Sequence, residues 1–237
     1  MTEFKHRGTE KKAFVQKMFD DISDRYDFLN HLLSLGIDYY WRHRLVKMLE
    51  PRPSEIILDV ATGTGDVGFA ILKKCDVTII GLDYAYNMTH LAKQKAEKRG
   101  IRSFKFVQGD GEQLPFSPNS FDAITIAFGF RNIGHFEVAL QEFFRVLKPG
   151  GRLVILEFSQ PTSAWFSAIF RFYFKYILPK IAALFARSDA YRYLPESVEQ
   201  FPERDVMTSM MDQFGFIKTH HTDLTFGVST LYLGWKS

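Results

Sequence analysis

The segment IILDVATGTGD, residues 56–66, determines how the whole chain is organised. Its apolar, β-branched start gives way to alternating glycines, which is typical of a buried parallel strand that turns sharply into a helix. Gly63 and Gly65 let a ligand approach the backbone where a Cβ would clash. The helix that follows offers unpaired N–H groups at the same place. We therefore expect a ligand site at the carboxyl end of this strand.

Asp83 carries the second part of the signal. It ends an apolar run over residues 77–83 and lies 18 residues after Gly65. A carboxylate at the end of the second strand can accept hydrogen bonds from both hydroxyls of a ribose. The two features together predict a cofactor that contains a nucleoside.

Two cofactors compete for this motif. Residues 63–68 satisfy the G-x-G-x-x-G dinucleotide fingerprint, but Asp59 and Asp66 place negative charge beside it. A pyrophosphate would be repelled there, whereas the sulfonium and ammonium groups of S-adenosylmethionine would be attracted. Asp66 has the alternative role of a helix cap. The charges favour S-adenosylmethionine over a nicotinamide dinucleotide.

Composition narrows the classes of function. With 237 residues, of which 46% are hydrophobic, the chain can fill one domain with a sizeable core. Its net charge of +3 comes without the dense basic stripe of nucleic-acid-binding proteins. The single cysteine, Cys75, and the polar start at 1–12 are compatible with the cytoplasm. The sequence has no metal-binding motif, and cations interrupt its longest apolar segment, 164–185, so we expect neither a metal nor a membrane span.

Strands and helices alternate along most of the chain after helical residues 10–50. This alternation predicts an α/β fold of the Rossmann-like, doubly wound type, with a mostly parallel seven-stranded sheet and N-terminal helices. We expect strands at 56–61, 77–83, 104–109, 122–128, 152–158, 216–224 and 229–236. We expect helices at 66–74, 87–99, 135–147 and 203–214.

The last third departs from this alternation. Residues 160–200 are rich in aromatic side chains, and the two final strands predict an antiparallel pair. An antiparallel C-terminal strand differs from an NAD-binding domain and favours a methyltransferase. The aromatic segment is either a helix packed on the sheet or a helical lid over an apolar substrate, with weak, reversible membrane contact through its cations. We expect one domain over 1–237, with a helical cap at 1–50 and this lid at 160–200.

Several motifs together resemble the class I S-adenosylmethionine-dependent methyltransferases. They are the loop at 59–66, Asp83, Gly109-Asp110 followed by 114–116, and residues 147–151. Narrower signals resemble the ubiquinone/menaquinone biosynthesis C-methyltransferase family, also called demethylmenaquinone methyltransferases, from about Phe14 to Lys236. They are Tyr26-Asp27 to Asn30, Ser34, Gly36, Trp41, residues 128–132, residues 145–159 and residues 191–197.

The chain departs from that family at a few positions. The family often has Met at Leu29, His at Asp38 and Ser at Ala127, so a hydroxyl contact at 127 is lost here. It often has two glycines before the loop threonine, where this chain has Thr62-Gly63, and Asn-Ala at Asp110-Gly111. An aspartate like Asp110 is common across class I methyltransferases, so adenine binding is still expected.

The resemblance implies methyl transfer from S-adenosylmethionine to a ring carbon of a demethylated isoprenoid quinol. The most direct reaction is demethylmenaquinol to menaquinol, with a second use in ubiquinone biosynthesis left open. The loop would surround the methionine part, Asp83 would bind the ribose, and Asp110 with Gly111 would hold the adenine. The expected cofactor residues are Asp59, Gly63, Thr64, Gly65, Asp83, Asp110 and Gly111.

The substrate residues are expected at the next strand end. Arg131 and Asn132 follow the fourth strand, where open α/β sheets bind ligands, and with Tyr26 they are expected to line the substrate pocket. The ring hydroxyl must lose a proton before the ring carbon becomes nucleophilic. The expected catalytic residues are Tyr193 and Glu196, and the further candidates for the base are Asp27 and His135.

Three other functions stay open at this point. They are a methyltransferase for another aromatic or lipid-like molecule, an NAD-dependent oxidoreductase, and a non-catalytic module that binds membranes or proteins. The resemblance implies an isoprenoid quinol partner, no nucleic acid, and a cytoplasmic location with transient contact at the inner face of the membrane. It specifies neither the tail length, nor the ring class, nor the oligomeric state.

Overall fold

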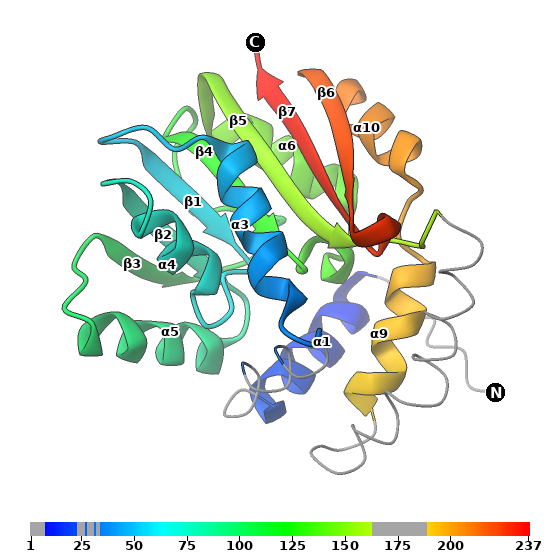
Figure 1. Ribbon diagram of the computed structural model, residues 1–237, viewed down its shortest axis with the longest axis horizontal. Coiled ribbons are helices and arrows are strands. Elements are labelled where there is room, and N and C mark those ends of the chain that lie inside the picture. The colour runs from blue at the N-terminus through cyan, green and yellow to red at the C-terminus, as the bar shows by residue number, and fades with distance from the viewer. Residues whose placement is uncertain (1–7, 23–26, 28–30, 32–33, 163–188) are drawn as a thin grey trace.

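The computed structural model describes residues 8–22, 27, 31, 34–162 and 189–237, which contain one seven-stranded sheet with helices on both faces (Figure 1). The strands are β1 Ile56–Val60, β2 Thr78–Asp83, β3 Phe104–Gln108, β4 Phe121–Ala127, β5 Leu147–Phe158, β6 Phe216–Leu224 and β7 Ser229–Lys236. The helices described are α1 Gly8–Ile22, α3 Ile37–Leu49, α4 Asp66–Leu72, α5 Tyr86–Lys98, α6 Phe136–Val146, α9 Asp189–Glu199 and α10 Arg204–Gln213. The 3-10 turns are η2 Phe130–Asn132 and η4 Thr225–Gly227.

The strand order distinguishes between the two cofactor-binding folds. It is β3-β2-β1-β4-β5-β7-β6, in which β1 to β5 pair in parallel and β7 is antiparallel to both of its neighbours. The mostly parallel sheet with an antiparallel C-terminal strand is therefore confirmed. An NAD-binding domain has the order 3-2-1-4-5-6 without this inserted strand, so the topology removes the structural support for the oxidoreductase alternative.

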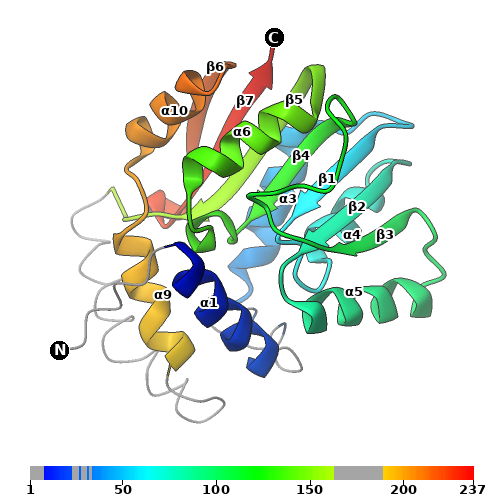
Figure 2. The same cartoon turned by 180° about the vertical axis from the view of Figure 1, so that it is seen from behind.

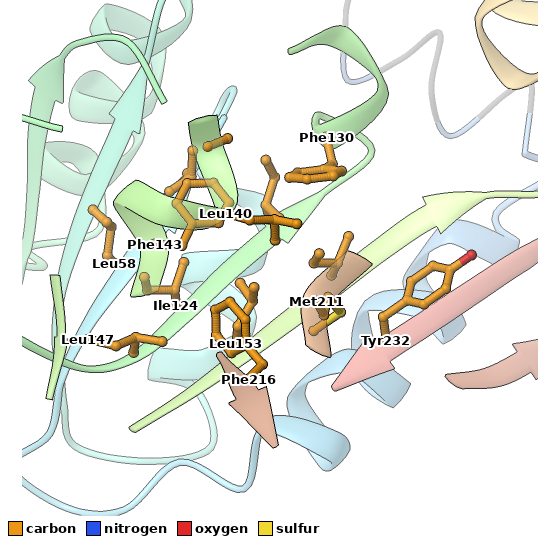
Figure 3. Close-up of a cluster of buried hydrophobic side chains, with 14 of the residues drawn as sticks. Leu58, Ile124, Phe130, Leu140, Phe143, Leu147, Leu153, Met211, Phe216 and Tyr232 are labelled. Carbon is orange, nitrogen blue, oxygen red and sulfur yellow. The ribbon is translucent and has the colours of Figure 1, made fainter. Parts of the chain in front are cut away.

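Side chains alternate between the two faces of the sheet, as the pleat of a strand requires. In β1, Leu58 faces α6 and α10 and joins a cluster that includes Phe143, Met211 and Tyr232 (Figure 3). Ile57 belongs to the opposite cluster, which α3, α4 and α5 cover. Because helices cover both faces, the apolar runs of the central strands are buried on both sides. The ends of the strands are therefore the places where a ligand can bind.

Helices α1 and α9 lie at one end of this sandwich. Figures 1 and 2 both show them side by side below the carboxyl ends of the parallel strands. The rings of Phe14 on α1 and Tyr193 on α9 are 5.6 Å apart. The two helices come from opposite ends of the sequence, so this end of the molecule is assembled only when the chain folds.

Two arginines of the 145–159 signature hold neighbouring segments of the fold in place. Arg145 donates to the carbonyl oxygens of Phe116 at 2.7 Å and Leu114 at 3.1 Å, which fixes the loop between β3 and β4. Arg152 is buried and pairs with Glu55 at 2.8 Å, while it also donates to carbonyl oxygens at the end of α3. These signature residues hold loops and a helix end.

Two expectations differ from the structure at this point. β5 begins at Leu147, which pairs with Phe121, so the strand starts before the expected 152 and includes the turn around Gly150. The helix before it ends at Val146 because the chain passes directly into the sheet. Most of the expected lid at 160–200 lies outside the described residues, which include 160–162 and 189–200 with helix α9.

Gly68 is the third glycine of the fingerprint, and the packing of α4 on the sheet requires it. A Cβ at this position would lie 2.2 Å from Cζ of Phe104, so α4 can approach the sheet this closely only without a side chain.

We expect Gly68→Ala to lower the free energy of unfolding by about 1–3 kcal/mol through overpacking, measured by urea denaturation. An exposed helical Gly→Ala change normally stabilises, so a stabilised variant would contradict this account. The double variant Gly68→Ala/Phe104→Leu should recover part of the loss.

Candidate cofactor and substrate site

A cavity of about 100 Å³ lies at the carboxyl edge of the sheet, among the segments that follow β1, β2, β3 and β4. Helix α1 closes it from the outside through Lys12, Val15 and Phe19. Open α/β sheets bind ligands at this edge, where neighbouring crossovers diverge. The cavity therefore marks the candidate site for the cofactor and the reacting part of the substrate, and it must widen to admit them because ligand pockets usually measure roughly 300–1,000 Å³.

Asp83 lines the cavity at the end of β2, as the sequence predicted. Its carboxylate accepts the Gly63 N–H at 2.8 Å and the Ala85 N–H at 2.9 Å, so one side chain links two loops. Burial raises the pKa of this carboxyl to about 6, with a contribution from the charge of Asp20 and against the pull of the backbone N–H groups. A carboxylate at this place is the type of acceptor that the hydroxyls of a ribose can use.

Asp59, in β1 just before the loop, is buried and does not line the cavity. Its oxygens accept hydrogen bonds from Thr62 at 2.6 Å and Thr125 at 2.7 Å. Burial raises its pKa to about 6 although both hydroxyls oppose the shift. Asp59 thus shapes the turn after β1, and its expected direct contact with the cofactor has no support in this position.

Thr64 and Gly65 also lie outside the cavity lining, whereas Gly63 is part of it. The Thr64 hydroxyl donates to the Asp27 carboxylate at 2.5 Å. Gly65 precedes α4 with a φ of 89°, a left-handed conformation that suits glycine. Of the loop residues expected to bind cofactor, only Gly63 faces the cavity, and the others set the shape of the turn.

Asp66 corrects the charge argument made from the sequence. Its carboxylate lies 3.3 Å from Arg42 and 3.6 Å from Lys95, on the opposite side of the loop from the cavity. Two cations therefore offset its charge. Asp83, Asp110 and Glu112 do line the cavity, but Lys12 lines it too and pairs with Asp110 and Glu112, so the preference for a cationic cofactor rests mainly on Asp83.

Asp110 and Gly111 line the cavity beyond β3. The Asp110 carboxylate accepts the Glu112 N–H at 2.9 Å and a hydrogen bond from Lys12 at 2.7 Å. Lys12 also pairs with Glu112 at 2.9 Å. Burial lowers the pKa of Lys12, but these two carboxylates outweigh burial and raise it above the usual value. The predicted adenine residues are thus fastened to α1.

Lys11 makes the second attachment of α1. Its ammonium donates to the carbonyl oxygens of Arg131 at 2.8 Å and Ile133 at 3.0 Å. Burial and the charge of Arg131 lower its pKa to about 8. Sequence reasoning missed Lys11 and Lys12, because two adjacent lysines on a helix usually mark a solvated face and the groups they bind lie more than ninety residues away.

Arg131 does not line the cavity, contrary to its expected role in the substrate pocket. It is buried and paired with the fully buried Glu157 at 2.6 Å, and its own N–H donates to Glu157 at 3.0 Å. The guanidinium also donates to the carbonyl oxygen of Phe128. This ion pair therefore holds the turn after β4, while its neighbour Asn132 does line the cavity.

Tyr193 reaches this turn from α9. Its hydroxyl donates to Oδ1 of Asn132 at 3.0 Å, which places it directly behind the cavity wall. Burial raises the pKa of Tyr193 to about 12, so the phenol keeps its proton at neutral pH. That favours a donor that orients groups and disfavours the expected role as a base. Glu196 is half-buried three residues further along the same helix.

The other base candidates are already paired with other side chains. Asp27 accepts from Thr64 and pairs with Lys95, and His135 bonds to Glu112 at 2.9 Å on an exposed loop. The predicted substrate residue Tyr26 lies outside the described residues. Among the residues that the structure describes, no group of three or more potential ligands could hold a metal ion, and no helix is long and apolar enough to cross a bilayer.

Comparisons with known proteins place this site in context. The sequence profile of the ubiE/COQ5 methyltransferase family matches residues 5–236. The ubiquinone/menaquinone biosynthesis C-methyltransferase UbiE of Geotalea daltonii is 47% identical over 231 residues, which are 96% of this chain and 98% of that protein. The demethylmenaquinone methyltransferase of Thermus thermophilus is 45% identical over 92% of this chain and 99% of its own.

A solved structure shares the fold at much lower identity. It is phosphoethanolamine N-methyltransferase 2 of Haemonchus contortus in complex with S-adenosyl-L-methionine, with a TM-score of 0.72 and 13% identity. The match covers 97% of this chain and 60% of that one.

Proposed function

This chain belongs to the ubiE/COQ5 methyltransferase family, and on that premise we propose that it transfers a methyl group from S-adenosylmethionine to a ring carbon of a demethylated isoprenoid quinol. The specific reaction we propose is demethylmenaquinol to menaquinol. Two of the compared relatives carry names that include menaquinone or demethylmenaquinone. The observation within the structure that carries the proposal is the cavity that joins Asp83 and Asp110 to Asn132.

The residues around this cavity fit the cofactor. The buried carboxylate of Asp83 offers acceptors for the ribose, and Asp110 with Gly111 offers an edge for adenine. The carboxylates also suit the positive charge of a sulfonium. When bound, S-adenosylmethionine supplies an activated methyl group on a good neutral leaving group. The protein must then hold the ring carbon in line and help the ring hydroxyl lose its proton.

We propose that Asn132 and Tyr193 hold the quinol hydroxyl. Tyr193 donates to Oδ1 of Asn132, and the amide nitrogen of Asn132 donates to the Phe128 carbonyl oxygen at 3.5 Å, which leaves its second N–H for a ligand in the cavity. Glu196 remains the proposed base, since Tyr193 keeps its proton and the alternatives Asp27 and His135 are paired elsewhere. Arg131 and Glu157 act indirectly, because they fix the turn that carries Asn132.

Tyr193→Phe tests this role. We expect kcat to fall about tenfold, the equivalent of one lost neutral hydrogen bond, with unchanged affinity for S-adenosylmethionine by calorimetry. The pH profile of kcat should keep its position, because a phenol that holds its proton does not set it. A profile that loses its acidic limb in the variant would instead make Tyr193 the base, because a general base stops working when falling pH protonates it.

The pH dependence of cofactor binding follows from Asp83. Its pKa of about 6 in the free protein lies above the ordinary carboxyl value, and hydroxyl donors favour its ionised form. Binding therefore releases a proton at low pH, and we expect affinity to fall by up to about tenfold for each pH unit below 6. Calorimetry between pH 5 and 8 measures this, and Asp83→Asn should flatten the profile. A wild-type affinity that is constant over this range would contradict it.

Turnover itself decides the substrate. Labelled S-adenosylmethionine is supplied with reduced short-tailed demethylmenaquinol or with the matching benzoquinol. Label in the first product alone supports the proposed reaction, and label in both adds a role in ubiquinone biosynthesis. No label in either tube, with cofactor still bound, would support the second candidate function, a methyltransferase for another aromatic or lipid-like molecule.

We further propose that the protein works in the cytoplasm as a single domain, with its cap at 1–50 and lid at 160–200. The helix α1 of the cap contributes to the cavity wall, which supports a shared site. An isoprenoid quinol resides in the bilayer, so the enzyme must meet it at the membrane surface.

A further inference from the structure

The start of α3 carries an unusual group of exposed apolar side chains. Leu35 is 72% exposed, Ile37 36%, Tyr39 61% and Tyr40 46%. Elsewhere in the described residues, the large exposed apolar side chains are scattered over separate helices, strands and turns, and Tyr84 and Tyr86 alone lie close in sequence. A run of exposed apolar side chains of this density marks an interaction site more often than chance. We name these four side chains the 35–40 tip.

Hydrogen bonds in the turn beneath the 35–40 tip fix the position of its backbone. The buried Asp38 accepts hydrogen bonds from Ser34 at 2.6 Å and Arg42 at 2.5 Å, and its other neighbour is His31 at 2.6 Å. Leu35 and Gly36 both adopt left-handed φ angles, 51° and 76°. The polar side chains of this turn are therefore satisfied internally. Tyr39 stacks on His31 with 4.4 Å between the ring centroids, while Leu35 and Ile37 remain exposed.

The tip lies at the edge that contains the cavity. Figure 1 shows α3 beginning beside α1, at the end of the sheet where the parallel strands finish. Trp41, next to the tip, donates to the hydroxyl of Thr225 at 2.8 Å, which fastens the first turn of α3 to the loop before β7. A substrate that comes from the bilayer would thus meet the cavity and the tip on one edge of the molecule.

Positive charge surrounds the tip. Arg44 stacks on Tyr40, with 5.8 Å from Cζ to the ring centroid, and donates to its hydroxyl at 2.8 Å. His43 and Lys47 are exposed on the same helix. A groove lined by Tyr39 also contains Lys73, Lys74 and Arg99, whereas its Lys95 pairs with Asp27 and Asp66 of the same groove. Tyrosines flanked by arginine and lysine are typical of side chains that sit at a membrane–water interface.

We propose that the 35–40 tip inserts into the surface of an anionic lipid bilayer and so docks the enzyme where its substrate resides. The proposal rests on the proposed function, because the bilayer-resident quinol gives docking its purpose. A second copy of the chain is a poorer occupant. Four side chains fall short of the roughly 800 Å² per partner of a stable interface, and a symmetric contact would bring the surrounding cations together.

The test uses the full-length protein and two double variants. Leu35→Asn/Ile37→Gln removes apolar surface from the tip, and Asn suits the left-handed φ of position 35. Ile56→Thr/Ile217→Thr is the matched control, since both are exposed residues at the starts of β1 and β6, on the far edge of the sheet. Each protein is sedimented with phosphatidylglycerol or phosphatidylcholine vesicles and assayed on a water-soluble short-tailed quinol and on a long-tailed quinol embedded in the vesicles.

We expect the tip variant to bind phosphatidylglycerol vesicles about tenfold more weakly than the control variant. It should lose activity on the embedded quinol in proportion and keep full activity on the soluble quinol. Wild-type binding should weaken on phosphatidylcholine. Equal vesicle binding by the two variants, or a wild-type dimer that the tip variant dissociates, would overturn the proposal. Failure of the proposed function is separate, because it would appear as no turnover of the soluble quinol by any of the three proteins.

Discussion

Glu157→Ala is expected to lower the free energy of unfolding by about 3–5 kcal/mol, because removal of one partner leaves a buried charge uncompensated. Glu157 is fully buried and accepts hydrogen bonds from Arg131 at 2.6 and 3.0 Å and from the Phe158 N–H at 2.8 Å. Without it, a guanidinium and two backbone N–H groups lose their acceptor. Urea denaturation of the purified variant measures the loss.

Two further variants isolate the cause. Glu157→Gln keeps an acceptor without the charge and should lose less than the alanine variant. Glu157→Ala/Arg131→Leu removes both members of the pair and should recover much of the stability, since buried pairs are often replaced by apolar residues at little cost. A double variant that is less stable than Glu157→Ala would show that Arg131 stabilises the fold by itself, through its bond to the Phe128 carbonyl.

Asp83→Ala should weaken binding of S-adenosylmethionine by about 1.5–3 kcal/mol, the range for a hydrogen bond to a charged group. The carboxylate would contact the cofactor directly, and it also accepts the Gly63 N–H that shapes the neighbouring loop. Isothermal calorimetry at pH 7.5 measures the affinity. Unchanged affinity would remove Asp83 from the site.

The control for Asp83 is its conservative replacement. Asp83→Asn keeps the side-chain size and one carbonyl acceptor, so it should fall between wild type and alanine. Asp59→Asn is a second control, since Asp59 lies behind the loop and accepts only from Thr62 and Thr125. We expect it to alter stability more than the affinity of a folded protein for the cofactor.

Most of the sheet could be predicted from the sequence because its signals are local. Apolar β-branched runs alternate with amphipathic segments, and the boundaries of β6 and β7 agree with the structure at both ends. The predicted start of β5 was wrong, since residues 148–151 belong to the strand and form an irregularity where its register with β4 shifts. Glycine and proline there indicate a break in local structure, but only the pairing of Leu147 with Phe121 shows that the strand begins before it.

The candidate site was harder to predict, since it depends on long-range contacts. Asp83 and Asp110 stand at strand ends and could be inferred from spacing. The pairing of Asp66 with Arg42 and Lys95 could not, and neither could the attachment of α1 through Lys12. Arg131 was assigned to the substrate because of its place after β4, whereas its partner Glu157 appears in the sequence only as one more residue of a strand.

The position of β7 between β5 and β6 also determines the order in which the sheet can be completed. β6 is synthesised before β7, yet in the finished sheet it pairs only with β7. A growing chain therefore carries β6 as an unpaired edge until β7 emerges and reaches β5, whose Arg152 pairs with Trp235 far along the sequence. Closure over such a separation is slow compared with local folding, and unpaired edges are prone to aggregation. We expect this final insertion to limit the refolding rate and to decide how much chaperone assistance the newly made protein needs.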